Sequence, residues 1–107
     1  MFINIIKSYR DVVAICDSDI LGKIFEEKIN GVTRQLDVKE NFYKGEEVDE
    51  AKAINLLKMM AAEDATFNIV GKDSVAAAIK AEVISKDSVG KIKDIPFALV
   101  LLWKLVL

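Results

Sequence analysis

Few side chains in this sequence are of the types that carry out nucleophilic or acid–base catalysis. The chain of 107 residues contains no histidine and a single cysteine. Without histidine there is no imidazole base for a serine or cysteine nucleophile and no imidazole ligand for zinc, and one thiolate cannot build a structural zinc site. We therefore expect no catalytic residue, no metal site and no cofactor.

The single cysteine, Cys16, ends an apolar run that begins at Val12, and Asp17 follows it. A reactive thiol needs a cationic neighbour to lower its pKa, whereas a carboxylate raises it. A lone cysteine in an apolar run usually packs as a small core side chain. We expect Cys16 to be inert toward thiol reagents in the folded protein.

Four polar residues near two strand ends could line one cleft. Asp17 and Lys23 flank the turn after the first strand end, where they could hold a cation or position a substrate. Asn68 and Ser74 flank Gly71 at a strand–turn–helix junction, where backbone N–H groups can bind phosphate. A capped helix and a solvated turn explain the same residues without any ligand, so both interpretations stay open.

Two aromatic residues beside a lysine form the best candidate for a binding surface. Phe42, Tyr43 and Lys44 lie in a segment, from Asn41 to Gly45, that we expect to be a loop. Exposed rings with a nearby cation suit stacking on a nucleic-acid base or contact with a partner protein. The alternative is that the rings fold back onto the core. The acidic residues at positions 46, 47, 49 and 50 fit a solvated helix start.

The charge balance argues against strong binding to nucleic acid in bulk. The chain carries 15 Lys+Arg and 17 Asp+Glu, for a formal net charge of -2, whereas such binding needs many uncompensated cations. The N-terminus lacks the basic and long apolar segments of a signal peptide. The longest apolar run, at residues 96–103, is well short of the roughly 20 residues that span a bilayer. We expect a cytoplasmic protein without a membrane segment.

The periodicity of apolar residues predicts the elements that must position these side chains. Apolar runs predict strands over residues 2–7, 11–16, 66–70, 89–93 and 97–102. Helical spacing predicts helices over residues 48–61 and 74–82, capped by Asp49 and Asp73. The pair Asn30-Gly31 suits a type I′ turn between two half-buried antiparallel strands.

This order of elements predicts an α+β two-layer sandwich, with a mainly antiparallel sheet and two main helices on one face. The length fits one domain over residues 1–107.

Several short stretches, taken together and in this order, resemble a known family. They are Val13-Ala14-Ile15-Cys16-Asp17, Leu21-Gly22-Lys23, Asn41-Phe42-Tyr43-Lys44-Gly45, and Asn68-Ile69-Val70-Gly71 followed by Ser74-Val75. The chain resembles the archaeal family catalogued as domain of unknown function 424, from Met1 to about Ala98. The resemblance implies a compact two-layer α/β sandwich in a cytoplasmic archaeal protein. It implies no activity, cofactor or catalytic residue.

Two functions of different class remain. The first, which the missing catalytic residue types favour, is a non-catalytic binding module for a protein or ribonucleoprotein partner. The second is a small enzyme or ligand-binding domain that uses Asp17, Lys23, Asn68 and Ser74 in a shared cleft, and convergence of those four residues would favour it.

The C-terminus is more apolar than one small domain can readily bury. Beyond the expected last strand the chain continues with Trp103, Leu105, Val106 and Leu107 around a single lysine. An exposed patch of this kind is unusual on a monomer. We predict that these four side chains pack across a symmetric homodimer, and the alternative is a tail folded over its own sheet.

Overall fold

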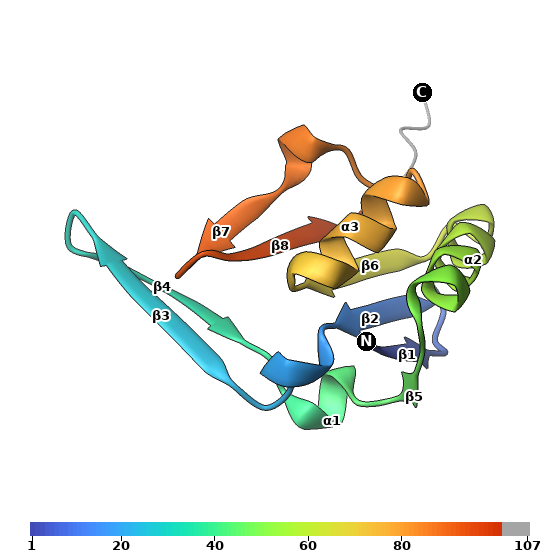
Figure 1. The fold of residues 1–107 in the computed structure, drawn as a ribbon, viewed down its shortest axis with the longest axis horizontal. Coiled ribbons are helices and arrows are strands. Elements are labelled where there is room, and N and C mark those ends of the chain that lie inside the picture. The colour runs from blue at the N-terminus through green and yellow to red at the C-terminus, as the bar shows by residue number, and fades with distance from the viewer. Residues whose placement is uncertain (102–107) are drawn as a thin grey trace.

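Residues 1–101 are described by the structure, a computed structural model of the chain, and they form a mixed α+β fold (Figure 1). The strands are β1 (Phe2–Ile6), β2 (Val12–Cys16), β3 (Ile24–Ile29), β4 (Val32–Asp37), β5 (Glu46–Glu47), β6 (Thr66–Val70), β7 (Gly90–Ile92) and β8 (Ile95–Val100). The helices are α1 (Glu40–Tyr43), α2 (Glu50–Ala62) and α3 (Lys72–Lys80), with short 3-10 turns η1 (Ser18–Ile20) and η2 (Lys86–Ser88).

Six of the strands form one sheet, and the other two form a separate ribbon. The sheet has the order β5-β1-β2-β6-β8-β7, and the ribbon pairs β3 with β4. Within the sheet only β2 and β6 run parallel; the remaining neighbours are antiparallel. The predicted fold class and the mainly antiparallel sheet are therefore confirmed.

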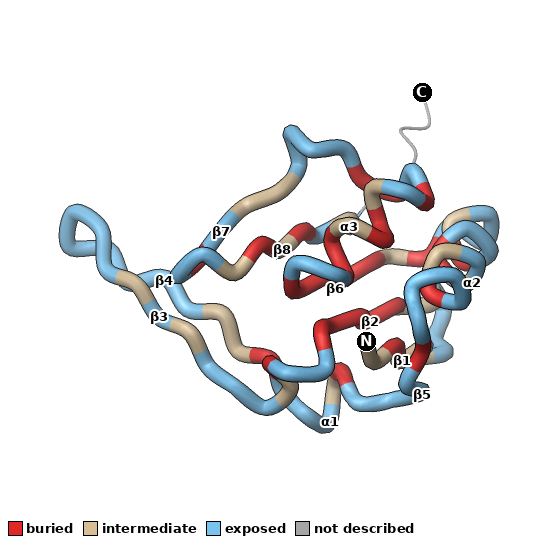
Figure 2. The backbone as a smooth tube through the Cα atoms, viewed as in Figure 1, coloured by how far each residue is buried: buried red, intermediate tan, exposed pale blue. Residues whose placement is uncertain are grey.

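Helices α2 and α3 cover one face of the six-stranded sheet (Figure 1). Every second residue along the strands points toward these helices. Its side chain is almost completely buried because the sheet and the helices together exclude water. The buried members on the strands are Ile3, Val13, Ile15, Phe67, Ile69 and Ala98. Figure 2 shows the buried stretches concentrated along β2, β6 and the helix sides that meet them. The expected apolar stripe of α2 is confirmed, with Ala53, Leu57 and Met60 buried against this layer.

The start of α3 differs from the prediction, although the start of α2 does not. The Asp49 carboxylate accepts the Lys52 backbone N–H at 2.9 Å, as a helix cap should. Helix α3 begins two residues before the expected Ser74, and Asp73 lies inside its first turn rather than capping it. The capping carboxylate comes from Asp17, far away in the sequence, so local pattern could not reveal it.

The opposite face of the sheet is covered only in part, by η1, α1 and the base of the ribbon. A second buried cluster lies there, with Ala14, Cys16, Ile20, Val38, Tyr43 and Val70 as its buried members. The ribbon itself extends away from the sheet, and Figure 2 shows it mostly exposed. We call this partly covered face of the six-stranded sheet, opposite α2 and α3, the open face.

Two further local predictions need correction. The ribbon turn is as expected, with Asn30 at φ 53° and Gly31 at φ 78°, but the strands have no buried face beside it, where Ile29 and Val32 are 50% and 62% exposed. The acidic run does not simply begin a helix, because Glu46–Glu47 form the edge strand β5 against β1.

The end of the chain is described only as far as Leu101. The expected final strand is confirmed as β8. The predicted interface residues Trp103, Leu105, Val106 and Leu107 lie outside the described residues. Among the helices of residues 1–101, none has the length and apolar character needed to cross a membrane.

Candidate functional site

A polar row crosses the middle of the open face. In the register of the sheet, Asn4 on β1 pairs with Ala14 on β2, Ala14 with Asn68 on β6, and Asn68 with Leu99 on β8. Directly paired residues point to the same face, so these four side chains form one line across four strands. Asparagine is unfavourable within strands, so each of the two in this row needs an explanation.

The two asparagines differ in their hydrogen bonding. The side-chain amide of Asn4 donates to the backbone carbonyl of Phe42 at 2.8 Å and so fixes the end of α1 to the sheet. Asn68 is partly buried, yet within residues 1–101 its side chain has no hydrogen-bond partner. Asn4 therefore has a structural role, whereas Asn68 offers a donor and an acceptor to something outside this part of the chain.

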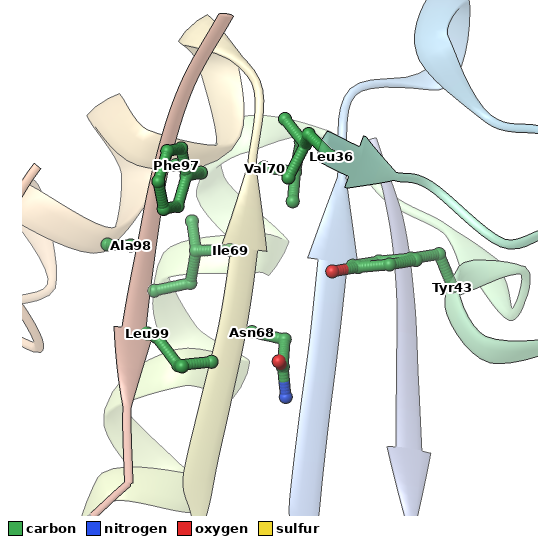
Figure 3. A pocket seen from close by; sticks show the side chains of 8 residues that line it. All are labelled: Leu36, Tyr43, Asn68, Ile69, Val70, Phe97, Ala98 and Leu99. Atoms are coloured by element: carbon green, nitrogen blue, oxygen red, sulfur yellow. The ribbon is translucent and has the colours of Figure 1, made fainter. Parts of the chain in front are cut away.

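Tyr43 reaches the same region from α1. Its ring lies across β2, and its hydroxyl points toward β6 (Figure 3). The small side chain of Ala14 in the polar row leaves room for the ring, which is 7% exposed. Within the described residues the hydroxyl has no hydrogen-bond partner, and no fully buried side-chain oxygen there lacks one, so the hydroxyl must reach open space.

The pKa of Tyr43 is raised from 10.0 to about 12, chiefly by burial, with smaller contributions from the negative charges of the Cys16 thiolate and the Asp37 carboxylate. The hydroxyl therefore stays protonated near neutral pH. In this form it can donate or accept a hydrogen bond, but it cannot serve as a base.

A pocket of about 190 Å³ opens beside this pair of groups, and we call it the sheet-face pocket (Figure 3). Its walls are mainly apolar, and its lining residues are Leu36, Tyr43, Asn68, Ile69, Val70, Phe97, Ala98 and Leu99. This volume is below the roughly 300–1,000 Å³ that is typical of pockets for drug-sized ligands. The sheet-face pocket is therefore suited to one side chain or one small ring.

A wider and more polar hollow adjoins the sheet-face pocket. It measures about 480 Å³ and is lined by Asp37, Lys39, Asn41, Phe42, Tyr43 and Asn68. Tyr43 and Asn68 thus stand at the boundary between an apolar pocket and a polar rim that carries both signs of charge. An apolar centre with a polar rim is the usual anatomy of a protein-binding surface.

The four residues of the predicted cleft do not come together. Asp17 and Ser74 are in contact, with the Ser74 hydroxyl donating to Oδ1 of Asp17 at 2.8 Å. Asn68 instead lines the sheet-face pocket, and Lys23 is exposed at the turn before β3. The sequence hypothesis of a catalytic cleft at these positions therefore loses the convergence that it required.

Asp17 acts as the cap of α3. Its carboxylate accepts the backbone N–H groups of Asp73 at 3.1 Å and Ser74 at 2.8 Å, in addition to the Ser74 hydroxyl. These are the donors that could have bound phosphate, so the candidate anion site at Gly71 is already filled by a carboxylate of the chain. A Cβ atom on Gly71, which has φ 110°, would lie 2.3 Å from Cγ of Asp17. Glycine is required there because the carboxylate packs so closely.

The aromatic segment is not an exposed loop. Residues Glu40–Tyr43 form α1, Tyr43 is buried, Phe42 is partly buried, and of the three predicted residues Lys44 alone is exposed. The two rings meet edge to face with centroids 5.0 Å apart. The interpretation that the rings fold back onto the core is therefore correct, and stacking of both rings on a nucleic-acid base is not available.

Cys16 belongs to the buried cluster on the open face that also contains Tyr43. Burial raises the pKa of its thiol from 9.0 to about 11, and the neighbouring Asp17 carboxylate adds to the shift. A buried and protonated thiol fits the expectation of an inert residue, and its labelling rate stays a prediction.

Within residues 1–101 no group of three or more histidine, cysteine or carboxylate side chains is arranged to hold a metal ion. The chemistry that the site offers is recognition through a neutral hydroxyl, an amide and apolar walls.

Sequence reasoning missed the apolar walls of the pocket, Leu36, Phe97 and Leu99. It placed Leu36 on the apolar side of a half-buried hairpin and expected the strand that holds Phe97 and Leu99 to be buried on both faces. The available signal was the pair of asparagines inside otherwise apolar strands, because such residues need a reason to be there.

Comparisons with known proteins agree with the fold and provide no activity. A family model described as "Protein of unknown function (DUF424)" matches residues 6–102. The crystal structure of an uncharacterized conserved protein from Methanopyrus kandleri is similar, with 24% sequence identity and a TM-score of 0.76. The match covers 99% of this chain and 96% of that one, and at this identity it shows a shared fold. No curated protein matches the chain significantly.

Proposed function

The chain belongs to the family described as protein of unknown function (DUF424), and we propose that this member is a non-catalytic binding module for a partner protein. The partner places one apolar side chain in the sheet-face pocket. Its backbone or a flanking polar group then pairs with Asn68 and Tyr43.

One observation carries the proposal: two polar groups without partners in the described chain lie at the mouth of one apolar pocket. Both groups reach the surface, so a partner's hydrogen bond replaces one that solvent can make, and its net contribution is about 0.5–1.5 kcal/mol per bond. A small apolar pocket with a polar rim also resembles the sites that receive anchor residues at protein interfaces.

The charges near the pocket favour a protein over a nucleic acid. Its polar rim holds Asp37 beside Lys39, and the whole chain has a net charge of -2. Nucleic-acid surfaces present several uncompensated cations to the phosphates. A ribonucleoprotein that is bound through its protein component remains compatible with this surface.

A pair of matched variants tests the proposal. Leu99 lines the pocket and is 54% exposed, and Met59 on α2 is 52% exposed on the helix side. Because both side chains are exposed, changing either one to aspartate should leave the fold intact. Leu99→Asp introduces a charge at the pocket wall, and Met59→Asp introduces the same charge elsewhere.

We expect the natural chain, immobilised in native lysate, to retain a protein that Leu99→Asp loses and Met59→Asp keeps, with nuclease treatment making no difference. Titration of the purified partner should then shift the side-chain amide resonances of Asn68. Retention that both variants share equally would contradict the proposal. Retention that nuclease abolishes would identify a nucleic acid as the ligand instead.

A further inference from the structure

Strand β3 has a free edge along its whole length. The ribbon contains only β3 and β4, so within residues 1–101 no strand is hydrogen-bonded to the side of β3 that faces away from β4. In Figure 1 this edge forms the outer margin of the molecule. A six-residue strand with unpaired backbone groups is a template for pairing with another strand.

The tight turn determines which backbone groups point outward. The residues that flank a two-residue turn, Ile29 and Val32, form a hydrogen-bonded pair, and bonded pairs then recur at every second residue. Phe25, Glu27 and Ile29 therefore direct their backbone groups toward β4. Ile24, Glu26 and Lys28 direct theirs to the free edge.

The free edge of β3 is complementary to itself when two copies run antiparallel about Glu27. In that register Glu26 of each copy lies opposite Lys28 of the other, and both residues present outward backbone groups. On the other face Phe25 lies opposite Ile29, which is 50% exposed in a single chain. One two-fold axis thus produces two ion pairs and two apolar pairs from four residues of each strand.

The two neighbouring in-phase registers are unfavourable. Centring the pair on Glu26 would place two carboxylates opposite each other in the bonded position, and centring it on Lys28 would do the same with two ammonium groups. Directly opposed like charges destabilise a strand pair.

The charge on the axis of the favoured register is already neutralised within each chain. Arg34, directly opposite Glu27 on β4, donates to Oε1 of Glu27 at 3.3 Å. The backbone N–H of Lys93 donates to Oε2 at 3.2 Å. When the two Glu27 side chains meet at the axis, each carboxylate is therefore already bonded to Arg34 and to the Lys93 backbone of its own chain.

We propose that two copies of this chain associate through the free edges of β3, forming a four-stranded sheet in the order β4-β3-β3-β4 across a two-fold axis. Main-chain hydrogen bonds hold the pair, and the Glu26–Lys28 ion pairs select its register. The interface lies on the ribbon and does not depend on the sheet-face pocket.

Charge reversal tests the register in the full chain. We expect the natural protein to have twice the 11.9 kDa mass of one chain by light scattering. Glu26→Lys or Lys28→Glu alone should weaken dimerisation by about tenfold or more, because each change replaces two attractive pairs with two repulsive ones. The double variant Glu26→Lys with Lys28→Glu restores both pairs and should dimerise like the natural protein.

Cross-linking provides a second measurement that does not depend on affinity. Residues that face each other at a two-fold axis between antiparallel strands have Cβ atoms about 4.5–5.5 Å apart, near the range that a disulfide can bridge. Glu27→Cys should form a disulfide-linked dimer under mild oxidation, since Cys16 is buried. Arg34→Cys, one strand further from the axis, should not.

A natural protein that stays monomeric overturns the proposal. So does a dimer whose mass is unaffected by either single reversal, since that dimer would use another surface such as residues 103–107. A single reversal that the double variant fails to rescue also contradicts the register. Leu99→Asp should leave the dimer unchanged, which separates this inference from the proposed function.

Discussion

The two faces of the six-stranded sheet are covered to different extents. On the face under α2 and α3, strand side chains such as Phe67 and Val13 are completely buried. On the open face neighbouring strands carry Asn68, whose side chain has no hydrogen-bond partner within residues 1–101, and Leu99, which is 54% exposed. One backbone therefore supports a dry layer on one side and an incompletely covered surface on the other.

This difference separates stability from recognition. A protein that needed only to fold would gain from an apolar side chain in place of an unpaired amide on a sheet, so an exception of this kind points to a function. The helix face should accordingly determine the free energy of unfolding, and the open face should determine what the protein binds.

The largest expected effect comes from breaking the helix-covered face. Phe67→Ala removes a completely buried ring and should lower the free energy of unfolding by about 3–5 kcal/mol. Leu99→Ala, on the next strand but on the open face, should change it by less than about 1 kcal/mol. Urea denaturation followed by circular dichroism measures both. Equal losses would mean that the two faces do not differ as described.

The next effect concerns the link between β2 and α3. Asp17→Ala removes a carboxylate that accepts three hydrogen bonds at the helix start, and it should cost about 3 kcal/mol of stability. Asp73→Ala is the matched control, because Asp73 lies in the same helical turn but is exposed, and it should cost about 0.5 kcal/mol. Similar losses in thermal denaturation would argue that Asp73 is the cap after all.

Alkaline pH should lower the stability of the protein by removing the protons of Cys16 and Tyr43, which are buried on the open face. The pKa values of Cys16 and Tyr43 are raised to about 11 and about 12, so the folded protein keeps these protons longer than the unfolded chain does. Their contribution to stability is complete below pH 9 and is lost as the pH rises from there toward 12, by roughly 3 kcal/mol per group.

Tyr43→Phe should remove its share of this loss, whereas Tyr9→Phe should not, because Tyr9 is fully exposed. Denaturant titrations at several pH values between 8 and 12 make the comparison, and the share of Cys16 should persist in Tyr43→Phe. If Tyr43→Phe loses as much stability as the natural protein over this range, the phenol is not a source of the loss.

Local pattern predicted most of the elements and the layer that the helices form. The apolar stripe of α2 and the Asn30-Gly31 turn depend on neighbours within a few residues, and both were predicted from them. The division of the strands into a sheet and a separate ribbon could not be predicted, since register between distant strands depends on contacts that no local window contains.

The candidate site was predicted poorly for the same reason. Asp17 is 57 residues from Ser74, so its capping of α3 is invisible in the sequence, where Asp73 is the nearer and more obvious cap. The aromatic segment contained the right residue, Tyr43, with the wrong exposure. Asn68 was identified, but it was grouped with Ser74 by its position in the sequence rather than with Tyr43 across the sheet.

The measurement that tests the central claim most directly compares the two asparagines of the polar row. Asn4→Leu removes the hydrogen bond to the Phe42 carbonyl and should lower the free energy of unfolding by about 1–2 kcal/mol. Asn68→Leu removes no hydrogen bond within the described chain and extends an apolar surface, so it should be neutral or stabilise by up to about 1 kcal/mol. If Asn68→Leu instead destabilises the protein as much as Asn4→Leu does, Asn68 is structural, and the open face is not the recognition surface.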